Sequence, residues 1–231
     1  MKILSSLSFL SVKGVPSLSW SSPKPLNLRP DLITVILLVL GLTIFGLGEA
    51  LLIAAGTGVS PWTVLAQGVS QQAGWSIGLS TFMISITVLI LWWPLKQVPG
   101  IGTILNAIII ALVLEFLLPW IPTPDAYIFK VLLTLSGILV TGLGSGIYLI
   151  ANLGPGPRDG LMTGLQQQTN FPIAWIRSGI ELTAVIAGWT LGGVVGLGTL
   201  LFALLIGPSV AGSLFLLNKV FGGKEKSEKV A

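Results

Sequence analysis

Six long apolar stretches limit the folds open to this sequence. A helix that crosses roughly 30 Å of hydrocarbon needs about 20 mostly apolar residues. Charged residues make up only 9% of the chain, which leaves little material for a water-soluble domain. We therefore predict an all-α, polytopic membrane protein with six transmembrane helices, over Leu32–Ala55, Ser76–Leu95, Ile104–Ile121, Ile128–Ala151, Pro172–Leu191 and Leu200–Leu217.

Two residue types that often serve in catalysis and metal binding are missing from the sequence. The chain has no cysteine and no histidine, which removes disulfides, thiolate nucleophiles, histidine bases and most metal ligation. We expect no metal, no cofactor and no enzymatic activity. The formal net charge of +4 comes from Lys and Arg that flank the apolar stretches, so we expect the lipid bilayer and not nucleic acid as the partner.

The ends of the chain predict its orientation. Residues 1–31 resemble a weak signal peptide, but serines interrupt the apolar run and no small-residue cleavage site follows, so we expect an uncleaved arm. Four Lys or Arg precede the first stretch and four Lys follow the last, in the charged tail 218–231. The excess of positive charge predicts that both termini are cytoplasmic.

An internal repeat divides the membrane region into residues 32–121 and 122–217. Displacing the sequence by 96 residues aligns Gly46–Ile108 with Gly142–Leu204 without a gap, and 22 of the 63 pairs are identical. Many identities are glycines and prolines that shape the backbone. Because each half holds three predicted spans, an odd number, the second half should have inverted topology.

Each half also contains a short segment that begins at a proline, over residues 61–72 and 157–168. These segments are too short to cross a bilayer as helices. We interpret them as re-entrant half-helices whose N-terminal amides favour anionic or carbonyl-like groups. Amphipathic connectors on the membrane surface are the alternative, and full crossing would make the repeats parallel.

Few ionisable residues lie inside the predicted spans, and such residues are functional candidates by default. Glu49 could bind a cation or carry a coupling proton, or it could simply face water; its repeat counterpart is Ser145. Arg177 and Glu181 are four residues apart on one helical face, which suits either a working or a purely structural ion pair. Glu115 lies nearer a membrane boundary and is a weaker candidate.

The most distinctive polar motif is Gly154-Pro-Gly-Pro-Arg-Asp-Gly160, at a predicted helix start. Arg158 could hold an anionic group together with the backbone near Gly154 and Gly156, while Asp159 favours the helix dipole and orients the arginine. The motif could equally be a cytoplasmic topology signal. Two Gly-x-Gly-Thr sequences, at 100–103 and 196–199, read as turns whose threonine caps the following helix.

The paired blocks GLGEALLIAAGTGVSPWTVLAQG and GLGSGIYLIANLGPGPRDGLMTGL, each followed by GIGT or GLGT, resemble the YczE/YyaS/YitT-type family of bacterial membrane proteins. The similarity covers about residues 32–217 and includes RSGIELTAVIAGWTLGG. The resemblance implies a bacterial plasma (inner) membrane location. It supplies no catalytic residues.

These features favour a transporter or permease-like protein for a small solute, which could be anionic and would bind where the repeats meet. The candidate site residues are Glu49, Gly154, Gly156, Arg158, Asp159, Arg177 and Glu181. A structural or regulatory membrane subunit is the second hypothesis, and an intramembrane enzyme acting on lipid-linked substrates is the third. Inverted halves of this size would also suit a homodimer.

Overall fold

The computed structural model describes residues 14–222, and within this range all regular structure is helical. Long helices alternate with two short ones in an order that repeats once along the chain. The elements are α1 (Leu32–Ala55), α2 (Pro61–Ala73), α3 (Ile77–Trp92), α4 (Ile101–Leu117), the 3₁₀ turn η2 (Leu118–Trp120), α5 (Tyr127–Ala151), α6 (Pro157–Thr169), α7 (Ile173–Thr190) and α8 (Leu197–Phe221).

Both short segments fold as helices that begin at the predicted prolines. Pro61 and Pro157 occupy the first helical turn, where a missing N–H is tolerated and the fixed φ suits a helix. Gly74 and Asn170 end the helices in left-handed conformation. Each helix has 13 residues, or roughly 20 Å, so neither is long enough to span the hydrocarbon layer alone.

Within residues 14–222, four helices are long and apolar enough to cross a membrane: α1, α4 with η2, α5 and α8. The pair α2 and α3 qualifies as a fifth span or as a re-entrant loop, because the two helices bend by 112° at a short break. The predicted span over residues 172–191 corresponds to α7, which carries Arg177 and Glu181 and does not meet this test. The structure thus supports four or five spans, and a count of six stays a prediction.

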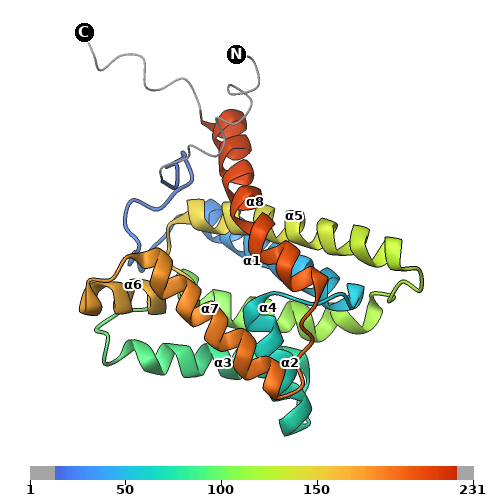
Figure 1. The fold of residues 1–231 in the computed structure, drawn as a ribbon. Helices are drawn as coiled ribbons and strands as arrows, with labels where there is room; N and C mark the ends of the chain where they lie inside the picture. Colours follow the sequence, from blue (N-terminus) through green and yellow to red (C-terminus); the bar gives the residue numbers. More distant parts are fainter. Residues whose placement is uncertain (1–13, 223–231) are drawn as a thin grey trace, which may run out of the picture.

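An antiparallel pair formed by α1 and α5 holds the centre of the molecule, where the two helices lie side by side (Figure 1). Gly41 packs against Tyr148, whereas Gly48 packs against Thr141, so residue numbers rise along one helix and fall along the other. A methyl group on Gly41 would lie 2.7 Å from the Tyr148 backbone nitrogen. The small residues let the two backbones approach closely.

Besides α1 and α5, two further pairs of helices join the halves in a matching way. Helix α2 packs on α7, and α3 packs on α6. The Gly102 N–H donates to the Leu153 carbonyl at 2.7 Å, and the Gly198 N–H donates to the Thr57 carbonyl at 2.9 Å. The two donors are 96 residues apart in the sequence, and so are the two acceptors. This is the same displacement that aligns the two halves.

The Gly-x-Gly-Thr sequences open α4 and α8, and the turn prediction is confirmed with one adjustment. The helices begin before the threonines, at Ile101 and Leu197. Thr103 therefore reaches back from the first turn, where its hydroxyl accepts from the Gly100 N–H at 3.1 Å and donates to the Pro155 carbonyl at 2.7 Å. The threonine thereby joins the start of α4 to the approach to α6.

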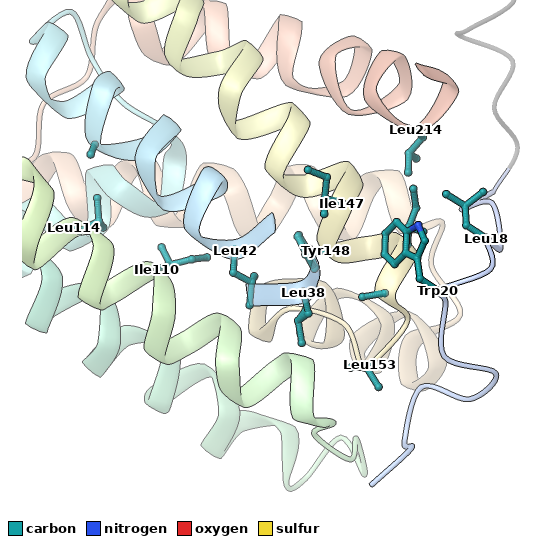
Figure 2. Packing of buried hydrophobic residues seen from close by; sticks show 13 residues of the cluster. Leu18, Trp20, Leu38, Leu42, Ile110, Leu114, Ile147, Tyr148, Leu153 and Leu214 are labelled. Carbon is teal, nitrogen blue, oxygen red and sulfur yellow. The ribbon is translucent and has the colours of Figure 1, made fainter. Parts of the chain in front are cut away.

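Residues 14–31 fold against the membrane helices. Leu18 and Trp20 are buried in the main hydrophobic cluster, and Figure 2 shows them near Ile147, Tyr148 and Leu214. The Trp20 carbonyl accepts from the Thr34 hydroxyl at 2.7 Å. This part of the predicted arm is therefore integrated into the fold.

The orientation prediction depends on Lys and Arg near the two chain ends. Residues 1–13 and 223–231, which carry several of the flanking lysines, lie outside the described residues. At the other boundary, α8 continues to Phe221, so the first residues of the predicted tail are helical.

Candidate functional site

A cavity of about 470 Å³ lies where the two short helices begin. Pro61 and Trp62 of α2 and Pro157 and Arg158 of α6 line it, and both pairs hold corresponding positions in the two halves. Further corresponding pairs in the lining are Phe45 with Thr141, Asn106 with Phe202, and Ile110 with Ile206. One wall, formed by α8, is mostly apolar, whereas the starts of α2 and α6 provide a polar end.

Arg158 and Trp62 contact each other in this cavity. The guanidinium carbon of Arg158 lies 5.3 Å from the centroid of the Trp62 ring, which is a cation–π geometry. Among residues 14–222, no carboxylate oxygen lies within 4.0 Å of the Arg158 guanidinium. The aromatic face is thus a direct contact that the protein provides for this charge.

Asp159, the next residue, is held by Tyr148 of α5. The Tyr148 hydroxyl donates to Asp159 Oδ2 at 3.0 Å. The indole N–H of Trp92 donates to the Pro157 carbonyl at 2.9 Å. These two contacts, from α5 and α3, set the position of the first turn of α6 and hence of Arg158.

Glu49 is buried behind the start of α2, with 1% of its surface exposed. Its Oε2 accepts hydrogen bonds from the hydroxyls of Ser60 at 2.8 Å and Thr63 at 2.6 Å. Ser60 and Thr63 also contact each other at 2.9 Å, which closes a ring of three oxygens. The other carboxylate oxygen, Oε1, is buried without a hydrogen-bond partner.

Glu49 also influences the cavity from behind. Like that of Asp159, its negative charge attracts the Arg158 guanidinium electrostatically. It is not among the residues that line the cavity. Glu49 therefore acts on the site through charge and through its hold on α2, and the water-facing alternative does not fit its burial.

Arg177 and Glu181 line the cavity from α7 and form the predicted pair, with Arg177 Nε 2.9 Å from Glu181 Oε1. The Arg177 side chain is 54% exposed. Exposed pairs four residues apart contribute only about 0.3–0.5 kcal/mol in water. The pair therefore contributes little to the stability of the fold. Its main effect is to neutralise the Glu181 charge at the edge of the cavity.

Comparison with known proteins places the chain among bacterial relatives. Residues 32–213 match a family of unknown function, DUF6198. The chain belongs to this family. An uncharacterized protein of Haemophilus influenzae is 42% identical over 207 residues, which cover 90% of this chain and 93% of the relative.

Two Bacillus subtilis proteins extend the comparison. The uncharacterized membrane protein YczE is 34% identical and covers 77% of this chain and 86% of its own length. The uncharacterized protein YyaS is 27% identical, with 73% and 86% covered. The YczE/YyaS resemblance is therefore confirmed, and the name of one relative agrees with a membrane location. No solved structure matches the sequence.

The structure of this DUF6198 member brings together most, but not all, of the predicted site residues. Gly156, Arg158, Asp159, Arg177 and Glu181 line the cavity, and Glu49 lies behind it. Gly154 does not line it; with φ +111°, it packs against Gly100 and Thr103. A side chain is strained at that φ, so glycine serves the turn geometry here.

Sequence reasoning missed three contributors to the site. Trp62 aligns with Arg158 in the repeat, and that correspondence was the available signal. Tyr148 is one of only two tyrosines and lies in a predicted span, where a buried hydroxyl needs a partner. Asn106 carried no signal beyond being an amide in an apolar helix.

Proposed function

We propose that the chain moves a small solute across the bacterial plasma membrane, with both termini in the cytoplasm. The solute occupies the cavity at the starts of α2 and α6, and access alternates between the two sides as the halves rock against each other. Irregular backbone at membrane depth is tolerated where it is buried in protein or lines a cavity, and the approaches to both short helices, residues 56–60 and 152–156, are irregular.

The single observation that carries the proposal is the contact between Trp62 and Arg158. These residues hold corresponding positions 96 apart, and they meet in the cavity at 5.3 Å. If a two-fold rotation relates the two halves, corresponding residues can touch each other only near the rotation axis. The antiparallel packing of α1 against α5 agrees with a two-fold axis in the same region. Inverted repeats with a central site are the arrangement that alternating access uses.

Substituted-cysteine accessibility tests this proposal without a known solute, because the chain has no native cysteine. Trp62→Cys, Arg158→Cys and Arg177→Cys are introduced singly and labelled in cells with membrane-impermeant thiol reagents, before and after permeabilisation. We expect Arg158→Cys or Arg177→Cys to react from outside as well as from the cytoplasm. Strictly one-sided labelling at every position would instead favour a structural or regulatory subunit.

Trp93→Cys supplies the matched control, because Trp93 is 88% exposed and lies outside the cavity lining. We expect it to react from one side or, if lipid covers it, from neither. Two-sided labelling of Trp93→Cys would show that the reagent itself crosses the membrane, and it would invalidate the readout at the cavity positions.

A further inference from the structure

The charged residues around the cavity differ in whether the protein supplies hydrogen-bond partners for their side chains. Asp159 accepts from Tyr148, Glu181 is paired with Arg177, and Glu49 accepts from Ser60 and Thr63. Arg158 is the exception. A guanidinium carries five N–H donors, and within the described residues none of them is used in a hydrogen bond or an ion pair.

A second unused donor lies beside it. Trp62 is 8% exposed, and its indole N–H is buried without an acceptor. Buried donors without acceptors are uncommon in folded proteins because each costs about 1–3 kcal/mol. The Trp62 N–H is buried, whereas the Arg158 side chain is half-buried. Two unused donors on side chains in mutual contact at a cavity favour an acceptor that comes from a ligand.

The other end of the cavity is apolar. Phe202, Ile206, Val210 and Leu214 of α8 line it, and a body without polar groups would displace water from this wall. The volume of about 470 Å³ lies within the range of small-molecule sites. The lining thus presents donors at one end and hydrocarbon at the other.

We propose that the ligand of this cavity is a small organic monoanion, with an oxyanion group at Arg158 and Trp62 and an apolar body along α8. A carboxylate matches the planar fork of the guanidinium, which can donate two parallel hydrogen bonds. Asp159 and Glu181 each accept from a donor of the protein, and Glu49, whose Oε1 is unpaired, does not line the cavity. This assignment rests on the transport proposal only in treating the bound ligand as the transported solute.

Protection of a cavity cysteine tests the assignment. Asn106→Cys is introduced into the full chain in lipid nanodiscs, and its alkylation rate is measured with acetate, butyrate, hexanoate, inorganic phosphate or butylammonium present. We expect protection by the carboxylates, with apparent affinity rising roughly fourfold per added methylene until the cavity is filled. Equal protection by butylammonium, or none by any carboxylate, would overturn the proposal.

Protection by phosphate tests the oxyanion group of the proposed ligand separately from its apolar body. If phosphate protects as well as hexanoate, the oxyanion site stands and the apolar body is wrong. Weaker protection by phosphate than by hexanoate is the expected result, because phosphate cannot cover the α8 wall.

The substitution Arg158→Gln tests whether the Arg158 charge binds the carboxylate of the ligand. In the Asn106→Cys background we expect it to weaken hexanoate protection about tenfold or more, since a charge-assisted bidentate pair is lost. Arg29→Gln, which removes an exposed arginine outside the cavity lining, should leave protection unchanged. Unchanged protection in Arg158→Gln would contradict the assignment, and the chain-length series in the Asn106→Cys background keeps the test decisive if Arg158→Gln does not fold.

Binding and transport fail in different ways in these experiments. Carboxylate protection combined with one-sided cysteine labelling would leave the ligand class standing and refute transport. Two-sided labelling without carboxylate protection would leave transport standing and refute the ligand class.

Discussion

Single side chains decide how the start of α2 is held. Glu49 is the common acceptor for the Ser60 and Thr63 hydroxyls in a fully buried environment. An acceptor removed from a buried site leaves its donors unsatisfied, whereas a conservative amide keeps one oxygen in place. The ring is therefore sensitive to the chemistry of position 49 more than to its charge.

We expect Glu49→Ala to lower the free energy of unfolding by about 2–4 kcal/mol, because two hydroxyls lose their acceptor and a cavity remains. Glu49→Gln should lose less, since its carbonyl oxygen can accept from one hydroxyl. Thermal unfolding in detergent micelles measures both. Glu115→Ala is the control, because its partner Ser76 is exposed; a loss as large as that of Glu49→Ala would contradict the account.

The Tyr148–Asp159 hydrogen bond is the second contact of this kind. Tyr148→Phe keeps the ring and removes only the hydroxyl that positions Asp159. We expect a loss of about 1–2 kcal/mol in unfolding free energy, because the donor is a neutral hydroxyl and the acceptor a carboxylate. Tyr127→Phe, at an exposed tyrosine, should change stability by less than about 0.5 kcal/mol.

The packing of some helix pairs depends on glycines that let the two backbones approach closely. On α1, Gly48 faces Thr141 and the carbonyl of Gly137, with no room for a methyl group. On α8, Gly212 has open space around it. The same residue type therefore serves different purposes in the two helices.

We predict that Gly48→Ala destabilises the protein by about 1–3 kcal/mol, because overpacking forces α1 and α5 apart. Gly212→Ala should be neutral or stabilising by up to about 1 kcal/mol, since alanine favours a helix more than glycine does. Unfolding by heat or denaturant in micelles compares the two variants. If Gly48→Ala were as stable as Gly212→Ala, the close approach of α1 and α5 would be wrong.

The arrangement of the whole chain determines whether corresponding helices run in opposite directions through the bilayer. Inverted halves place the connection before α5 outside and the connection after α3 inside. We expect Asp125→Cys to react with an impermeant thiol reagent in intact cells, and Lys96→Cys to react only after permeabilisation. The reverse pattern, with Lys96→Cys labelled in intact cells and Asp125→Cys only after permeabilisation, would indicate that the short helices cross fully and that the repeats are parallel.

The N-terminal segment also belongs to the whole-molecule fold, although the DUF6198 match begins only at residue 32. Trp20→Ala should destabilise the protein by about 3–5 kcal/mol, because a buried aromatic side chain leaves a cavity. It should also speed chymotryptic cleavage after Leu18, which is buried in the same cluster as Trp20. Trp93→Ala, at a tryptophan that is 88% exposed, is the control and should leave the cleavage rate unchanged.

Local patterns predicted the helices, the proline starts of α2 and α6, and the family, because each depends on neighbouring residues or on residue spacing along the chain. The same patterns also predicted spans over α3 and α7, and neither helix by itself is among the four that are long and apolar enough to cross a membrane. Apolar composition extends beyond the ends of α3, at Ile77 and Trp92, while Arg177 and Glu181 make α7 more polar than the four long apolar helices. Composition alone does not set where a helix ends, because that depends on caps and on the contacts of the next segment.

The sequence was sufficient to single out Glu49, Arg158 and Asp159, because a charge in an apolar chain is costly wherever it is buried. It could not show that Trp62 lies under Arg158, that Tyr148 holds Asp159, or that Gly154 serves a turn away from the cavity. Those contacts join residues on different helices, and one of them spans the full 96-residue displacement. They exist because α1 and α5 pack antiparallel and bring the starts of α2 and α6 to the same cavity, and no local pattern encodes that packing.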